Sequence, residues 1–273
     1  MLKAIKQARA AVGMLNPDEV RRRARQPVRI GLVAFDGAGY AAMEDFLAPA
    51  LEQVYRAGDP GVPDKVDLVL YQQGIPCPQD AYLLRFDDPV ATIAEILRDH
   101  EDLELALARQ FAPFRKPVVE RIIQAVSREN AVFAVATALP NLIPNLGEIP
   151  WAFGEFASDT AFLTANQVRM AFLIAAACGK QAGYSQRTAE ILSIAAGAFG
   201  WRALARELAG KIPFGGGIIP KGAIAYAGTF VVGKGLEHYH HAGAAYTRAQ
   251  REEVYQAALE RGKAVAETLR DGV

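Results

Sequence analysis

The stretch from Val28 to Tyr55, VRIGLVAFDGAGYAAMEDFLAPALEQVY, decides how the first half of the chain folds. Residues 28–34 are apolar except for Arg29 and predict a buried strand, and residues 41–55 predict the helix that follows it. Residues 35–40 (FDGAGY) form the turn between them. A strand, a glycine-containing turn and a helix in this order indicate the beginning of an α/β domain.

Further α/β elements follow this stretch. The apolar run at 66–71 (VDLVLY) has few polar residues in alternation, which is typical of a parallel strand covered on both faces. Residues 82–86 predict a third strand. Asp88 and Pro89 predict the start of a helix over 90–98, because Asp is a preferred N-cap and Pro fits the first helical position.

The turn at 35–40 lies where a nucleotide-binding P-loop would lie. That loop has the pattern G-x-x-x-x-G-K-S/T, because backbone N–H groups hold the phosphates, the Lys neutralises them and the hydroxyl holds Mg²⁺. At the four defined positions this chain has Ala34, Gly39, Tyr40 and Ala41, so the Lys and the metal ligand are missing. An ordinary tight turn and a decayed GTPase loop both explain the segment. Gly37 and Gly39 are expected to be required for the turn in either case.

An anion bound at the start of this helix stays open as an alternative, because free N–H groups and the helix dipole would remain. We expect such binding to be weak, since Glu44 and Asp45 lie nearby and oppose it.

Charge and cysteine content limit the function classes. Thirty basic and thirty acidic residues cancel, so no nucleic-acid partner is expected. The first 29 residues are strongly basic, which indicates a solvated leader or a segment that contacts an anionic surface. Asn16 and Pro17 predict a short helix within this segment. The isolated Cys77 and Cys178, without a secretory apolar segment, predict a cytoplasmic protein, with association at the inner membrane as an alternative.

From Pro117 onward the chain is rich in Ala and Gly and predicts a multi-helix bundle. The last helix begins with a capping box of Thr247 and Gln250. A soluble or peripherally attached bundle is favoured over a membrane-inserted hairpin, because charges or prolines interrupt every long apolar run. The predicted helices cover 117–138, 151–178, 185–209, 219–241 and 247–270.

Two connectors of this bundle, 139–150 and 212–220, are broken by prolines and are unusually apolar for loops. Their apolar side chains predict a patch for a membrane or a protein partner, unless they turn into the core. The patch residues are Leu142, Ile143, Leu146, Trp151, Phe214, Ile218 and Ile219. The glycines at 215–217 indicate a helix–helix turn, since no strand precedes them.

Several groups of packing residues stand out in this half: 138–141 with Pro144, 167–170, 200–208, 211–215 and 226–228. With them, residues 115 to about 239 resemble the bacterial GTPase-associated helical family known as domain of unknown function 697. In that family the helical domain often follows a GTPase domain and is associated with the membrane or with envelope stress. The resemblance covers a little under half the chain and implies the helical fold, while the family's own biochemical activity is not established.

The front half is similar to a shortened GTPase domain that has lost the residues that bind phosphate and Mg²⁺. Gly39 matches the second P-loop glycine, and Tyr40 and Ala41 stand in the lysine and Ser/Thr positions. The D-x-x-G switch motif would fall on 71–74, where Tyr71 replaces the Asp that organises Mg²⁺. No N-K-x-D base-reading motif is present. These losses predict that the chain does not hydrolyse GTP.

Two further clusters are weighed as metal sites and set aside. Paired carboxylates on bundle helices hold metals together with E-x-x-H repeats, and the sequence has none. His238 and His241 are three residues apart but too few for a zinc site. We therefore predict no catalytic, cofactor-binding or metal-ligating residue. The polar residues weighed here, Glu148, Glu155, Asp159 and Asn166, are interpreted as a polar helix edge or as partners for Arg169 and Arg202.

Together these features predict a mainly α protein with a small α/β part: a short parallel Rossmann- or P-loop-like sheet followed by a multi-helix bundle. We expect a non-catalytic bacterial protein whose bundle binds a membrane or a partner. A nucleotide- or anion-responsive switch, or a soluble scaffold subunit, are the alternatives, and an oligomer stays open. The expected segments are a basic helical leader (1–27), a degenerate P-loop-like domain (28–114), the bundle (115–246) and a C-terminal amphipathic helix (247–273).

Overall fold

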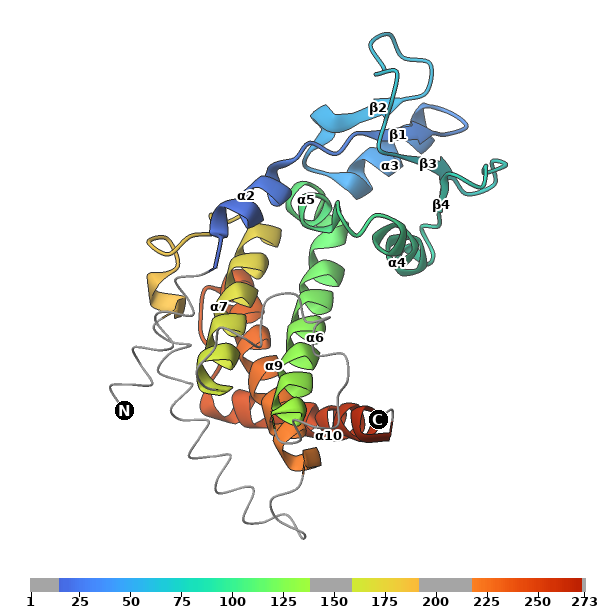
Figure 1. Ribbon diagram of the computed structural model, residues 1–273. Helices are drawn as coiled ribbons and strands as arrows, with labels where there is room; N and C mark the ends of the chain where they lie inside the picture. The colour runs from blue at the N-terminus through green and yellow to red at the C-terminus, as the bar shows by residue number, and fades with distance from the viewer. Residues whose placement is uncertain (1–14, 138–158, 192–217, 272–273) are drawn as a thin grey trace. The chain divides into compact units, whose positions relative to one another are not determined.

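The computed structural model describes residues 15–137, 159–191 and 218–271 (Figure 1). As the sequence predicts, the fold is mainly α with one small four-stranded parallel sheet. The described chain divides into two compact units. The α/β unit contains residues 18–120 and 175–181, and the helical unit contains the rest. Each unit is described by itself.

The sheet of the α/β unit contains four strands in the order β2-β1-β3-β4, and every neighbouring pair is parallel. The strands are β1 (Ile30–Val33), β2 (Val54–Arg56), β3 (Leu68–Gln72) and β4 (Tyr82–Leu84). Because all are parallel, their carboxyl ends meet at one edge of the sheet. Ligands of open α/β sheets bind at that edge, where neighbouring connections diverge, which here is the point between β1 and β3.

The helix after β1 is shorter than the sequence predicts. Helix α3 (Gly37–Leu47) ends before Ala48, because a residue that precedes a proline is driven out of the helical region, and Pro49 follows. Residues 51–53 form a 3₁₀ turn, and the predicted last helical residues instead form β2. The prediction of one helix over 41–55 is therefore wrong in its second half.

The central strand β1 is buried at three successive residues and so on both faces, whereas β3 and β4 are fully covered on one face only. In β3, Leu68 and Leu70 are buried, whereas Val69 and Tyr71 are half-buried, and β4 alternates in the same way. The connections β2–β3 and β3–β4 contain no helix, so few elements pack on the second face. The expectation of a strand covered on both faces is thus met on one face.

The α/β unit contains four more helical segments: α2 (Pro17–Arg25), α4 (Pro89–Asp99), α5 (Glu104–Gln110) and the first part of α6 (Ala112–Ala136). The predicted start of α4 is confirmed, because the Asp88 carboxylate accepts the Ala91 N–H at 3.4 Å. The sequence analysis missed α5. It also placed the start of α6 at Pro117, which in fact lies inside the helix and removes one of its backbone hydrogen bonds.

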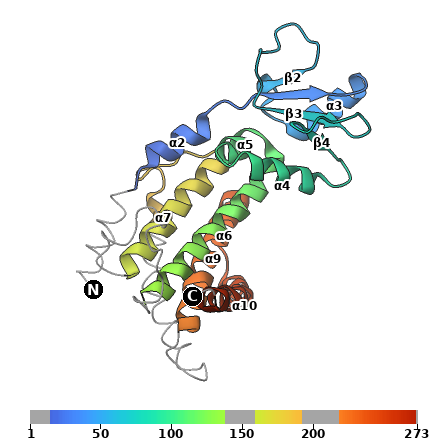
Figure 2. The ribbon, with the colours of Figure 1, turned by 45° about the vertical axis from the view of Figure 1, so that its right-hand side comes forward.

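The helical unit is built from the rest of α6 with α7 (Asp159–Ala177), α9 (Ile218–Ala242) and α10 (Arg248–Asp271), shown from a second side in Figure 2. The predicted helices 219–241 and 247–270 match α9 and α10 to within one residue at each end. The capping box is confirmed: the Gln250 N–H donates to Thr247 Oγ1 at 3.3 Å, and the Thr247 N–H donates to Gln250 Oε1 at 2.9 Å.

Helix α10 packs along α9 at very short range. A β-carbon on Gly262 would lie 2.7 Å from the carbonyl oxygen of Ala223, so only glycine allows the two backbones to approach this closely. Among the described helices, none has both the length and the apolar character needed to cross a membrane.

Candidate functional site

The turn between β1 and α3 is closed by its own carboxylate. Asp36 has an extended backbone (φ −155°, ψ −179°) and is the N-cap of α3. Its Oδ1 accepts the Gly39 N–H at 2.8 Å, and its carbonyl accepts the Tyr40 N–H at 3.1 Å. An N-cap side chain satisfies one of the free N–H groups of a first helical turn. Here it does so with a full negative charge at the place where a phosphate would bind.

A second side chain closes the turn from the neighbouring strand. Gln72, the last residue of β3, accepts the Phe35 N–H on its Oε1 at 3.1 Å. The same amide lies against Gly39, where a β-carbon would come within 2.2 Å of Oε1 and 2.9 Å of Cδ. Gln72 therefore fills the space between the carboxyl ends of β1 and β3.

The two glycines of the turn have different roles. Gly39 is required for space, because its missing β-carbon leaves room for Gln72. Nothing lies within 4 Å of a β-carbon on Gly37, and its backbone is not in the left-handed region. The expectation that both glycines are needed for the turn is therefore wrong for Gly37.

The geometry also differs from that of a P-loop. Only residues 34–36 separate β1 from α3, so no loop surrounds a phosphate-sized space. Gly39, Tyr40 and Ala41 already lie within α3. A P-loop needs backbone N–H groups that converge on the anion from an open loop. Here the N–H groups of Phe35 and Gly39 bond to protein oxygens instead.

Tyr40, which stands in the lysine position, packs in an ionic cluster. The Arg56 guanidinium lies 5.4 Å from the centre of the Tyr40 ring and donates two hydrogen bonds to Glu44, at 2.6 and 2.7 Å. These bonds lower the pKa of the Glu44 carboxyl. The charge of Glu44 is thus compensated by Arg56, and Asp36 is the carboxylate that bonds to the turn. Glu44 was predicted to oppose an anion at the helix start, and the role of Asp36 was not predicted, although an Asp directly before a helix is a common cap signal.

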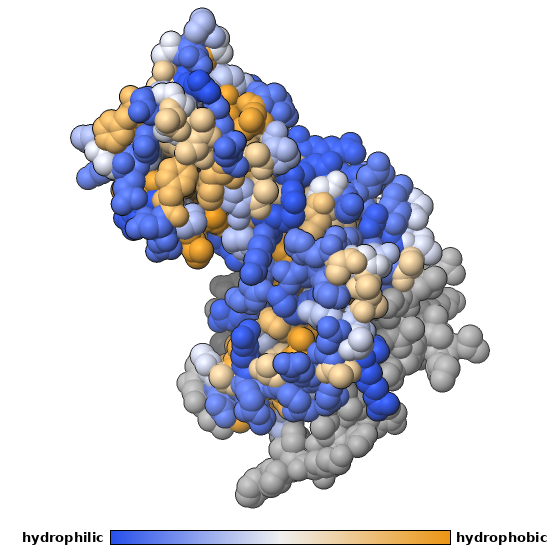
Figure 3. All heavy atoms as spheres, turned by 180° about the vertical axis from the view of Figure 1, so that it is seen from behind, coloured by the Kyte–Doolittle hydropathy of each residue, from blue (hydrophilic) through white to orange (hydrophobic). Residues whose placement is uncertain are grey.

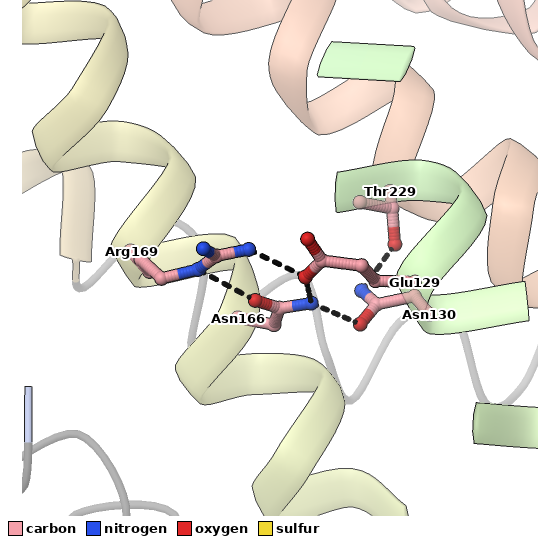
Figure 4. A network of polar contacts seen from close by, with 5 residues as sticks. All are labelled: Glu129, Asn130, Asn166, Arg169 and Thr229. Atoms are coloured by element: carbon pink, nitrogen blue, oxygen red, sulfur yellow. Dashed lines mark hydrogen bonds and ion pairs between the residues drawn. The ribbon is translucent and has the colours of Figure 1, made fainter. Parts of the chain in front are cut away.

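A buried polar network joins three helices of the helical unit (Figure 4). Asn130 of α6 donates to Thr229 of α9 at 2.7 Å and accepts from Asn166 of α7 at 2.9 Å. All three side chains are buried. Gln167 adds a bond of 3.3 Å to Thr229. The amide and hydroxyl groups of this network satisfy one another inside the bundle, as most buried polar groups do.

The network continues to an ion pair at its outer end. Arg169 donates to Asn166 Oδ1 at 2.9 Å and is paired with Glu129, which also accepts from Asn166 at 3.0 Å. The prediction for Asn166 was a polar helix edge or a partner of Arg169. The polar edge is wrong for Asn166, which is fully buried, and the contact with Arg169 is confirmed. Glu148, Glu155 and Arg202 lie outside the described residues, and Asp159 begins α7. The partners that the prediction missed are Glu129, Asn130 and Thr229.

The histidines near the end of α9 have separate surroundings. His238 stacks on Tyr246 with ring centres 4.5 Å apart, and His240 lies 3.9 Å from a carboxylate oxygen of the buried Glu190. His241 is exposed. Within the described ranges, no group of three His, Cys, Asp or Glu side chains is arranged to hold a metal ion.

Most of the predicted apolar patch cannot be placed. Leu142, Ile143, Leu146, Trp151 and Phe214 lie outside the described residues. Ile218 and Ile219 do not belong to a connector: they form the first turn of α9, where Ile219 is half-buried. In the switch position, Tyr71 is a half-buried residue of β3.

Apolar side chains also reach the surface of the α/β unit, among hydrophilic ones (Figure 3). Phe35 follows β1 and is 65% exposed, and Phe86 and Val90 follow β4 and are also exposed. They come after parallel strands, so the carboxyl edge of the sheet presents aromatic surface instead of a phosphate-binding loop. 

Comparison with known proteins gives no match: no family model, no curated protein and no solved structure is similar to this chain. The resemblance to the GTPase-associated helical family therefore stays a hypothesis carried by the sequence.

Proposed function

We propose that the chain is a non-catalytic binding protein, in which an α/β unit that holds no nucleotide is joined to a helical bundle. The observation that carries this proposal is the closed turn, where Asp36 and Gln72 bond to the N–H groups of Gly39 and Phe35. Phosphoryl transfer needs positive charge and Mg²⁺ around the phosphates. Tyr40, Ala41 and Tyr71 supply neither.

The proposed role of the bundle is to bind a membrane surface or a protein partner. Its support is the sequence of the two apolar connectors, together with the resemblance to a family that follows GTPase domains. The Asn130–Asn166–Thr229 network supports a bundle with one fixed helix register, because buried polar groups lose their partners when helices slide. A soluble scaffold subunit is the alternative that lacks the membrane contact.

Calorimetric titration with GTP and Mg²⁺ tests the nucleotide part of the proposal. Wild-type protein is expected to give no saturable heat from binding at the turn. An Asp36→Asn variant keeps a capping oxygen but removes the charge, and Asp45→Asn removes an exposed charge of the same helix away from the cap. Micromolar binding by the wild-type protein at the turn would overturn the proposal.

A further inference from the structure

Helices α2 and α5 bring together basic side chains from two separate parts of the sequence. The end of α2 is tied to the end of α5, because the Gln110 side chain donates to the Gln26 carbonyl at 2.9 Å and accepts the Val28 N–H at 3.4 Å. Arg25 directly precedes Gln26, and Arg109 directly precedes Gln110. Figures 1 and 2 both show α2 beside α5. The two arginines therefore come from adjacent points of two helices.

The acidic residues of α2 are already paired. Asp18 forms an ion pair with Arg21, and Glu19 forms one with Arg22. Arg25 is exposed and has no ion pair to any acidic group in the part of the chain that the structure describes. Its charge is therefore in excess on this helix.

Arg109 is half-buried and bonds to a backbone oxygen. Its Nη1 lies 3.5 Å from the carbonyl oxygen of Lys180, in the segment 175–181 of the same unit. Burial and the neighbouring Arg25 both lower the pKa of Arg109, as expected for two like charges close together. A guanidinium has five N–H donors, so one long bond leaves most of them available to a ligand. Lys180, whose carbonyl oxygen accepts this bond, also has an exposed cationic side chain.

We propose that Arg25 and Arg109, with Lys180 beside them, form a binding site for a phosphate-type oxyanion. Two guanidiniums match the oxygen atoms of phosphate by charge and by paired hydrogen bonds. The ligand is a free phosphate group or the headgroup of an anionic lipid, since both present the same oxygens. This inference rests on the proposed function in one respect: it names the class of ligand for the binding role proposed above.

Nucleic acid fits this site less well. Duplex binding commonly uses 6–10 phosphate contacts, and single strands need aromatic platforms. None of the exposed aromatic side chains of the described residues lies on α2, on α5 or in 175–181. Three cations without an aromatic or apolar anchor fit one small anionic group.

Three variants of the full chain test the site, with inorganic phosphate as the first probe. Arg25→Gln changes an exposed side chain and is expected to fold normally. Arg109→Gln changes the half-buried partner. Arg98→Gln is the matched control, because Arg98 is an exposed arginine of the same unit that is already paired with Asp99 at 3.2 Å. Calorimetry should show saturable phosphate binding that each site variant weakens by about tenfold, and Arg98→Gln should leave it unchanged.

Thermal unfolding checks the same binding without relying on heat signals. A ligand that binds only the folded protein raises its unfolding temperature. Phosphate should raise that temperature more for wild type and Arg98→Gln than for Arg25→Gln. Because phosphate also stabilises proteins nonspecifically, the rise measured for Arg25→Gln in the same phosphate buffer is the reference, and chloride at equal ionic strength controls for ionic strength.

Vesicles of phosphatidylcholine, with and without phosphatidic acid, separate the two ligand sources. Phosphate binding together with selective sedimentation on the acidic vesicles supports a lipid headgroup, and phosphate binding alone supports a free phosphate. If neither binds, or if both site variants bind as wild type does, the proposal is overturned. A GTP titration repeated in Arg25→Gln keeps this result separate from the turn, since any heat from the arginine site would then decrease and heat from the turn would not.

Discussion

Gln72 lies in the space that the missing side chain of Gly39 leaves, and its Oε1 accepts the Phe35 N–H there at 3.1 Å. A strand end, a helix start and a side chain from the next strand are thereby locked together. This contact gives a structural reason, independent of any phosphate, for the glycine at the position of the second P-loop glycine. The glycine makes room for a protein amide.

Gly39→Ala is expected to expel the Gln72 amide. The end of a Gln side chain can move, so the cost is the lost bond to Phe35, about 1 kcal/mol of unfolding free energy. Gly37→Ala is the matched control and should be neutral or stabilising by up to about 1 kcal/mol, because nothing opposes its β-carbon and alanine favours a helix. Urea denaturation measures both. Equal stability of the two variants would contradict the packing role of Gln72.

Thr229→Val should destabilise the bundle by about 1–3 kcal/mol, because it leaves the buried amide donors of Asn130 and Gln167 without their acceptor. Thr268→Val on the exposed side of α10 removes only a bond to a carbonyl of its own helix and serves as the control. Denaturant midpoints compare the two. A loss no greater than that of Thr268→Val would show that the network is dispensable.

Gly262→Ala tests the contact between α9 and α10. Its β-carbon would lie 2.7 Å from the Ala223 carbonyl oxygen and 3.0 Å from Ala223 Cα, and backbone cannot rotate away. We expect a loss of about 1–3 kcal/mol or more. Gly235→Ala on α9 meets nothing closer than 3.9 Å and should not destabilise. The unfolding temperatures of the two variants test this prediction. A Gly262→Ala variant with the wild-type unfolding temperature would mean that the two helices are farther apart.

The pH dependence of stability should include a contribution from Glu44. Its pKa is lowered in the folded protein by the hydrogen bonds from Arg56, so this contribution is present above the ordinary pKa of 4.5 and is lost as the pH falls through the lower folded value. Glu44→Gln should therefore flatten the fall in the urea midpoint below about pH 4.5. Glu52→Gln, a change of an exposed acid outside the pair, is the control. If Glu44→Gln keeps the wild-type slope, the pair does not stabilise the fold.

Much of the fold could be predicted from the sequence where local signals decide it. The Asp88 cap and the Thr247–Gln250 capping box each specify a helix start through atoms a few residues apart. Elements that depend on distant contacts were missed. The strand β2 has only three residues, and it exists because it pairs with β1.

The candidate site was predictable in outline and not in its contacts. The sequence shows that Lys, Ser/Thr and the switch Asp are absent. It does not show what replaces them, because the Gln72–Phe35 bond joins residues 37 positions apart. The Asp36 cap could have been predicted, because an Asp directly before a helix is a preferred N-cap. The P-loop pattern defines glycine positions and does not include this Asp.

The central claim is that the turn is occupied by the protein's own oxygens, and the backbone amides of Phe35 and Gly39 report on it directly. In a ¹H–¹⁵N NMR titration of the full chain with GTP and Mg²⁺, the account predicts that these two amide signals do not move, while both exchange slowly with solvent. In Asp36→Ala the Gly39 signal should shift and exchange faster, because its acceptor is gone. Saturable shifts of the Phe35 and Gly39 signals in the wild-type protein would contradict the account.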